Sequence, residues 1–187
     1  MFRKRQRQPG PDEIESREIK DPAKSRERTM NRAVKLLAAK PRSTRELRER
    51  LLERSWTNAE IVDAVIQKLS DYGYLDDRQY AGDLAISKLR QKPQGRRRLQ
   101  QTMSQKKLDK ETVSEAIDAA FEKMPESELI DKAIKKRLRL KGRPETREDV
   151  KRFYDHLLRQ GFSYDLVGTR MREIANIRPD GAEGDAL

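Results

Sequence analysis

The segment Asp71-Tyr72-Gly73-Tyr74-Leu75-Asp76-Asp77-Arg78-Gln79-Tyr80-Ala81 decides the fold, because it closes one helical pattern and opens another. Apolar residues recur at helical spacing over residues 61–69, and Gly73 follows where a helix end favours a left-handed backbone. Asp76 then offers its carboxylate to the free N–H groups of a following helix, and Leu75 supplies the apolar contact that often precedes such a cap. The segment predicts two helices joined by a tight turn.

Residues that end one helix and start the next recur about every 50 residues along the chain. Prolines that break helical patterns are 52 and 51 residues apart, at Pro41, Pro93 and Pro144. A second marker is an apolar residue followed directly by a residue suited to cap a helix, where the apolar side chain can pack on the first turn. Such pairs are 52 and 54 residues apart, at Trp56-Thr57, Leu108-Asp109 and Phe162-Ser163. Two independent markers with one period indicate tandem repeats.

We therefore expect an all-α fold, built as an elongated tandem array of three three-helix repeats. Thin units suit this composition, because Leu, Ile, Val and Phe together number only 38 of the 187 residues. The expected parts are a flexible basic N-terminal tail at 1–28, helical repeats at 29–73, 74–124 and 125–175, and a disordered C-terminal tail at 176–187.

Start and stop signals predict the helices of the first repeat. The first helix is expected to begin near Thr29, where the apolar pattern begins, and to end before Pro41. The capping box formed by residues 43–46 opens the second helix, with Ser43 as the cap. Thr57 is expected to cap the third helix.

Composition restricts the class of partner. The chain has 43 Lys and Arg against 32 Asp and Glu, a net charge of +11 and a pI near 9.9, which favours an anionic partner such as nucleic acid. No run approaches the roughly 18 apolar residues of a membrane span, and the N-terminus lacks the apolar core of a signal peptide. We expect a cytoplasmic protein without a membrane partner.

No catalytic constellation is evident in the sequence. The chain lacks cysteine, which excludes disulfides and thiolate sites, and its one histidine, His156, lies inside a helical pattern with no nucleophile in prospect. There is no glycine-rich phosphate loop or metal-ligand spacing. We expect a protein that is not an enzyme and uses neither a metal nor a cofactor.

Two basic clusters are the candidate binding residues. The first lies on a short helix and its end: Arg96, Arg97, Arg98, Lys106 and Lys107. The second recurs at i, i+3, i+4 and i+7, opposite an apolar stripe on the same helix: Lys132, Lys135, Lys136 and Arg139. Such a ridge can neutralise phosphates without reading bases. The alternative for both clusters is a solvated helix face.

The stretch from Gly73 to Ala81, which forms the joint between the two predicted helices, closely resembles the central signature of the RecX family, regulators of the RecA recombinase. The likeness covers about residues 30–175, and its further parts are Ser43 to Leu52, then Gly95, Arg98, Leu99, Met103 and Lys106, and finally Leu157 to Phe162. Lys107 and Ser55 stand where glycine is usual in the family, and Met103 where leucine is usual. These departures are expected to alter helix ends or packing without removing the fold.

The resemblance implies a modulator that lies in the groove of the RecA–DNA filament and inhibits ATP hydrolysis, strand exchange and filament growth in DNA repair. We expect the protein to be a monomer. Its partners are the RecA filament and DNA, by way of the filament or directly, and no cofactor is implied. The motif residues, structural or for recognition, are Gly73, Tyr74, Leu75, Asp76, Asp77 and Tyr80.

Two other classes of function stay open at this point. One is a helical DNA-binding protein acting independently of RecA, in which the capped helix pairs would be helix-turn-helix units. The other is a scaffold that binds only protein. Salt-dependent DNA binding in the absence of RecA would favour the first class, and the lack of any contribution from DNA would favour the second.

Tyr74 is the motif residue that capping does not explain. It stands between Gly73 and Leu75, outside both predicted helices. It therefore either packs one repeat on the next or faces the partner. We expect it to pack.

Overall fold

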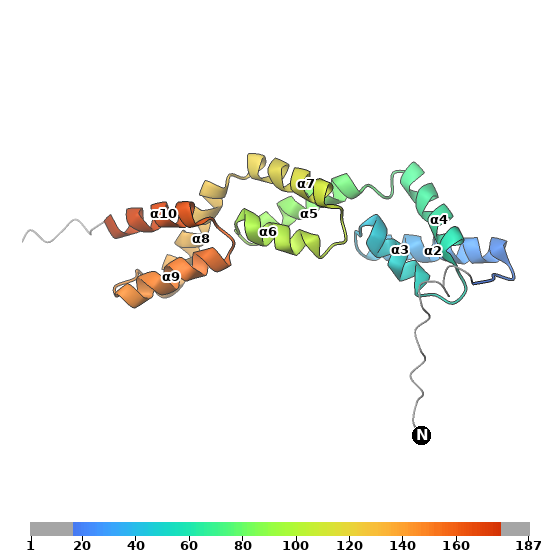
Figure 1. The fold of residues 1–187 in the computed structure, drawn as a ribbon, viewed down its shortest axis with the longest axis horizontal. Coiled ribbons are helices and arrows are strands. Elements are labelled where there is room, and N and C mark those ends of the chain that lie inside the picture. The colour runs from blue at the N-terminus through green and yellow to red at the C-terminus, as the bar shows by residue number, and fades with distance from the viewer. Residues whose placement is uncertain (1–16, 177–187) are drawn as a thin grey trace, which may run out of the picture. The chain divides into compact units, whose positions relative to one another are not determined.

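A computed structural model describes residues 17–176 of the chain, and over this range the fold is all-helical, with nine helices and no strand. Numbered as in Figure 1, the helices are α2 (Pro22–Ala39), α3 (Thr44–Leu52), α4 (Ala59–Asp71), α5 (Asp77–Gln91), α6 (Arg96–Ser104), α7 (Lys110–Lys123), α8 (Glu126–Lys141), α9 (Arg147–Arg159) and α10 (Tyr164–Asn176). The all-α prediction is confirmed. Most of the two predicted tails, residues 1–16 and 177–187, lies outside the described residues.

The described residues form two compact units. The first comprises residues 17–81 with 106–109, and the second comprises residues 82–105 with 110–176. The repeat boundaries at 73/74 and 124/125 stay an interpretation of the sequence period. None of the helices over residues 17–176 combines the length and apolar character that crossing a bilayer requires.

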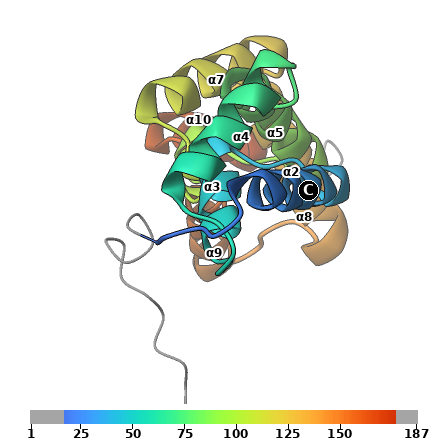
Figure 2. The ribbon, with the colours of Figure 1, turned by 90° about the vertical axis from the view of Figure 1, so that its right-hand side faces the viewer.

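The core of the first unit lies among α2, α3 and α4, which pack on one another in both views (Figures 1 and 2). Its buried members are Ala33, Leu47, Leu51, Val62, Val65, Ile66, Leu69 and Leu75. The residues of each helix recur at spacings of three or four, so that each helix presents one apolar stripe to the other two. Full burial of a Leu, Ile or Val side chain contributes about 1.5–3 kcal/mol, which makes this cluster the main source of stability of the unit.

Helix α2 begins seven residues before the predicted start. Asp21 caps it by accepting a hydrogen bond from the Lys24 N–H at 3.0 Å, and Pro22 occupies the first helical position. In the extra turn Ser25 is only 4% exposed, and its hydroxyl donates to the Trp56 carbonyl. The start at Thr29 was therefore wrong, because the added turn packs through polar groups that an apolar pattern does not reveal.

The cap of α4 also differs from the prediction. Asn58, and not Thr57, is the N-cap, and its side-chain oxygen accepts from the Ile61 N–H at 3.0 Å. Thr57 is buried, with its hydroxyl 3.1 Å from the Thr29 hydroxyl. A threonine that suits a cap has thus been used to satisfy a buried polar contact with α2. The predicted cap of α3 is confirmed, since Ser43 accepts from the Glu46 N–H at 3.2 Å.

The joint between α4 and α5 has the predicted geometry. Gly73 has a φ of +73°, its N–H donates to Ser70, and the Tyr74 N–H donates to Leu69, both at 2.9 Å. These are the two hydrogen bonds of a Schellman helix end. Asp76 then accepts from the Gln79 N–H at 2.9 Å and starts α5. The chain therefore leaves α4 and enters α5 through groups supplied by the motif itself.

A pair of glycines joins two helix ends within the second unit. The Gly95 N–H, at the start of α6, donates to the Gln160 carbonyl at 2.9 Å at the end of α9. A Cβ on Gly95 would overlap the backbone of Gly161, and a Cβ on Gly161 would overlap the backbone of Arg98. Gly161 also has a φ of +88°. Only glycine at both positions lets the two backbones approach this closely.

Candidate interface for an anionic partner

The predicted ridge on α8 is exposed to solvent. Its members are Lys132, Lys135, Lys136 and Arg139, and the opposite side of the helix carries the buried residues Leu129, Ile130, Ala133 and Ile134. Lys132 lies 3.9 Å from the Glu128 carboxylate, an exposed pair of the kind that contributes little. Within the described residues, the other three cations have no ion pair. Lys135, Lys136 and Arg139 are therefore positioned to meet an external anion.

Arg96 makes its contacts with other residues of the second unit. Its guanidinium contacts the Asp118 carboxylate and lies 5.0 Å from the centre of the Phe121 ring. The Arg96 N–H, at the first turn of α6, donates to the Glu126 carboxylate at 3.0 Å. A cation in the first turn opposes the helix dipole, and the Glu126 carboxylate supplies the compensating negative charge. Arg96 is thus held by its own unit and is a weak candidate for an external phosphate.

The two other arginines at the start of α6 differ from each other. Arg98 donates to the Arg159 carbonyl at 3.0 Å and so braces the end of α9. Arg97 is exposed and has no ion pair among the described residues. Of the three predicted arginines, Arg97 alone is presented to solvent without a partner in the described part of the chain.

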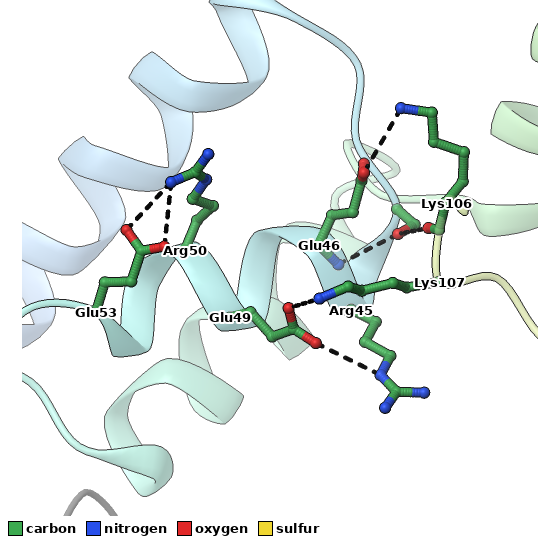
Figure 3. A network of polar contacts seen from close by, with 8 residues as sticks. Arg45, Glu46, Glu49, Arg50, Glu53, Lys106 and Lys107 are labelled. Atoms are coloured by element: carbon green, nitrogen blue, oxygen red, sulfur yellow. Dashed lines mark hydrogen bonds and ion pairs between the residues drawn. The ribbon is translucent and has the colours of Figure 1, made fainter. Parts of the chain in front are cut away.

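Lys106 and Lys107 pair with α3 of the first unit (Figure 3). The Lys106 ammonium lies 3.7 Å from the Glu46 carboxylate, and the Lys107 ammonium contacts the Glu49 carboxylate. The Ser43 hydroxyl, which caps α3, also donates to the Lys106 carbonyl at 2.7 Å. These two lysines therefore attach the loop after α6 to α3, and they are poorly placed to bind phosphate.

Lys107 also has an unusual backbone. Its φ is +57°, the only positive φ among the non-glycine residues that the structure describes. This conformation costs an ordinary residue about 1–2 kcal/mol and suits glycine. The departure from the family pattern at this position therefore places a side chain where glycine fits better, and that side chain reaches Glu49.

Asp77 has a role that local capping did not predict. One of its carboxylate oxygens accepts from the Thr44 N–H at 2.8 Å and from the Thr44 hydroxyl at 3.1 Å. Asp77 thus caps α3 from a position 33 residues away. Tyr80, one turn further along α5, is half-buried, and its pKa is raised by burial and then by the negative charge of Glu46. Together with the buried Leu75, these residues make the motif a structural element of the first unit.

Tyr74 is exposed, which contradicts the expectation that it packs between repeats. Its exposed fraction is 69%, and that of Tyr72 on the other side of Gly73 is 63%. The Lys68 ammonium lies 5.7 Å from the centre of the Tyr72 ring, and no other ring contact of this pair is present in the described part of the chain. Two exposed aromatic side chains beside a helix end do nothing for the core and are available for binding.

No metal centre is evident over residues 17–176, where His, Asp and Glu side chains nowhere gather in groups of three. The ionisable groups that the structure brings together are ion pairs and helix caps. Each unit therefore presents its own candidate surface: the exposed cations of α8 in the second unit, and Tyr72 and Tyr74 in the first.

Comparison with known protein families identifies two domains. Residues 30–69 match the first three-helix domain of RecX, and residues 76–117 match the second. The regulatory protein RecX of Bacillus velezensis is 30% identical over 163 residues, which cover 86% of this chain and 60% of the relative. The regulatory protein RecX of Bacillus licheniformis is 28% identical over 159 residues, covering 83% of this chain and 59% of the relative. This chain thus spans about three fifths of the length of these Bacillus relatives.

A solved structure has the same fold. The crystal structure of RecX from Lactobacillus salivarius superposes with a TM-score of 0.72 at 21% sequence identity, and the match covers 83% of this chain and 99% of that one. At this level of identity the likeness concerns the path of the backbone. It agrees with the helices described above and leaves the surface chemistry to be argued from this chain.

Proposed function

The chain belongs to the RecX family, and we propose that it regulates the RecA recombinase by binding the RecA–DNA filament and inhibiting its ATP hydrolysis, strand exchange and growth. The family consists of regulatory proteins and not of enzymes. Binding without catalysis is the activity that exposed cations and aromatic side chains support. The proposal places the protein in the cytoplasm, with the DNA on which such a filament forms.

The observation that carries the proposal is the set of unpaired cations on α8. Lys135, Lys136 and Arg139 project from the side of the helix opposite its buried residues, so they can bind an anion without any change in the core. A filament offers phosphate and acidic side chains, and each contact with phosphate releases a condensed counterion. Engagement through these residues would therefore weaken as salt concentration rises.

The exposed tyrosines support a contact with protein. Tyrosine is enriched among the residues that dominate binding energy at protein interfaces, because it buries a large apolar ring and keeps a polar tip. Tyr72 and Tyr74 lie on either side of a helix end whose φ, hydrogen bonds and cap are fixed by the motif. Their backbone is thus held in one conformation before binding, which lowers the entropic cost of the contact.

RecA-driven, DNA-dependent ATP hydrolysis tests the proposal. The parent protein is expected to slow hydrolysis at substoichiometric amounts. The variant with Lys135, Lys136 and Arg139 changed to glutamate is expected to lose most of this inhibition at physiological salt. A control with Lys24, Arg26 and Lys35 changed to glutamate has the same net charge, with its changes at exposed positions of α2, and is expected to inhibit as the parent does.

Two outcomes would count against this function. If the α8 variant and the α2 control lose inhibition equally, net charge and not the α8 ridge governs binding. If the parent leaves ATP hydrolysis unchanged but binds single-stranded DNA without RecA, the protein acts independently of RecA. In that case the slope of log affinity against log salt should become shallower by about 2 when the three cations are reversed, at roughly 0.7 per phosphate contact.

A further inference from the structure

The second unit contains a cavity of about 230 Å³, which shares Lys136 with the ridge on α8. It lies between the last turns of α8, the residues that follow α5, and α9. Four cationic side chains line it, and no acidic side chain is among the lining residues: Lys92, Lys136, Arg137 and Lys141. The cavity therefore gathers positive charge at one point, in contrast to the linear ridge on α8.

This concentration of charge is unusual for the unit. Elsewhere in it, several arginines pair with carboxylates, as Arg170 does with Asp131 at 2.8 Å. Within the described residues, Lys92, Lys136 and Lys141 have no ion pair. The nearby C-terminal ends of α5, α8 and α9 offset about half a charge each, so about two and a half of the four positive charges stay uncompensated.

Two side chains hold the geometry of the cavity. The Arg137 guanidinium lies 5.0 Å from the centre of the Phe153 ring, which fixes the plane of its hydrogen-bond donors. The Gln160 side-chain amide lies 2.6 Å from His156 Nε2, so these two lining side chains are hydrogen-bonded to each other. A planar guanidinium held in this way is suited to bidentate binding of phosphate oxygens.

The pKa of His156 responds to the positive charges around the cavity. Its pKa is lowered by burial and then by the positive charges of Arg137, Arg159 and Lys92. An anion in the cavity would counteract the three charges and raise the pKa again.

We propose that this cavity binds the polyphosphate group of a small anion, and that a nucleoside di- or triphosphate is the class of ligand. Such a group brings about three to four negative charges into a small volume, enough to neutralise the cations that line the cavity. The wall formed by Pro93 and Leu140 offers apolar surface for the nucleoside, and Leu140 is 65% exposed. This inference goes beyond regulation of a filament and requires only this chain.

The chain has a single histidine, so its imidazole NMR signals can be assigned to His156 without further labelling. Inorganic pyrophosphate, magnesium-free ATP and a 5′-phosphorylated oligonucleotide are titrated separately into the full chain, at ionic strength matched with sodium chloride. We expect a saturable shift of the His156 resonance with pyrophosphate and with ATP, and a rise of the His156 pKa toward its ordinary value. ATP is expected to bind more tightly than the oligonucleotide.

Neighbouring lysines on α8 supply a matched pair of variants. Lys136→Gln removes a lining charge and is expected to weaken pyrophosphate binding about five- to tenfold, the effect of roughly 1–1.4 kcal/mol. Lys135→Gln removes an equal charge one residue away, outside the lining, and is expected to change binding less than about twofold. Both positions are exposed, and circular dichroism will check that helicity is unchanged.

Three results would overturn the proposal. The first is a His156 resonance that moves no more with pyrophosphate than with chloride. The second is an equal loss in the two glutamine variants, which would indicate diffuse attraction. The third is tighter binding of the 5′-phosphorylated oligonucleotide than of ATP, which would make a strand end the ligand. Because RecA is absent from these titrations, their failure is distinct from failure of the proposed regulation.

Discussion

Replacing Asp77 with alanine tests whether the joint stabilises the first unit through a long-range helix cap. The Asp77 carboxylate accepts from the Thr44 N–H at 2.8 Å and from its hydroxyl at 3.1 Å. A hydrogen bond to a charged group contributes about 1.5–3 kcal/mol, and loss of a helix cap costs about 0.5–2 kcal/mol. Both residues are only partly buried, so water will replace part of the lost interaction. We expect the free energy of unfolding to fall by about 1–2 kcal/mol.

Trp56 is the only tryptophan of the chain and lies in the same unit as the cap, so its fluorescence during urea unfolding follows that unit. Asp77→Asn keeps an acceptor oxygen and is expected to recover most of the loss. Glu27→Ala is the control, because Glu27 is exposed on α2 in the same unit as Trp56, and it is expected to cost less than about 0.5 kcal/mol. The reasoning is refuted if Asp77→Ala unfolds at the urea concentration of the parent, or if Glu27→Ala is as destabilising.

Three further predictions address features that the structure changed or added. Tyr74→Ala should alter the unfolding free energy by less than about 0.5 kcal/mol and still weaken inhibition of RecA; a loss near 3 kcal/mol in urea unfolding would show that the ring packs. Removing residues 1–28 should destabilise the first unit by at least about 2 kcal/mol relative to removing residues 1–16, because Ser25 is buried, and equal Trp fluorescence transitions would contradict this. The folded pKa of His156 is below its ordinary value of 6.5, so the unfolded chain takes up the proton more readily and stability should fall as pH drops from about 7.5 to about 5.5. His156→Gln should show a smaller fall in urea unfolding over the same interval, and an unchanged fall would assign the pH dependence to other groups.

Features within about four residues of each other could be predicted from the sequence. Gly73 ends α4, Asp76 starts α5 and Ser43 caps α3, as their spacing indicated. Each of these depends on a side chain or backbone that meets its own helix end, so the partner is known once the helix is known. The periodic apolar residues likewise predicted an all-helical fold without strands in the described range.

Contacts between distant polar residues could not be predicted in this way. Asp77 reaches Thr44 across 33 residues, and Lys107 reaches Glu49 across 58. A charged residue fits a solvated face, a cap or an ion pair equally well, and only the packing of the helices selects among these. The exposure of Tyr74 is of the same kind, because an aromatic residue in a turn is buried or presented according to what the fold brings near it.

The predicted binding residues divide, for the same reason, into cations held in internal ion pairs and cations that are available to a partner. Lys106 and Arg96 match the basic pattern as well as Lys135 does, yet their charges meet acidic residues of the same unit. Lys135 has no ion pair within the described residues, because Asp131, four residues before it on α8, pairs with Arg170 instead. The sequence identified cationic surface, and the structure identifies which part of it is available.

The junction between Gly95 and Gly161 has an evolutionary consequence. It is made largely by main chain against main chain, with a hydrogen bond from the Gly95 N–H to the Gln160 carbonyl. Substitutions at exposed positions of α6 and α9 are therefore compatible with the same junction, whereas a side chain at either glycine would force the two helix ends apart.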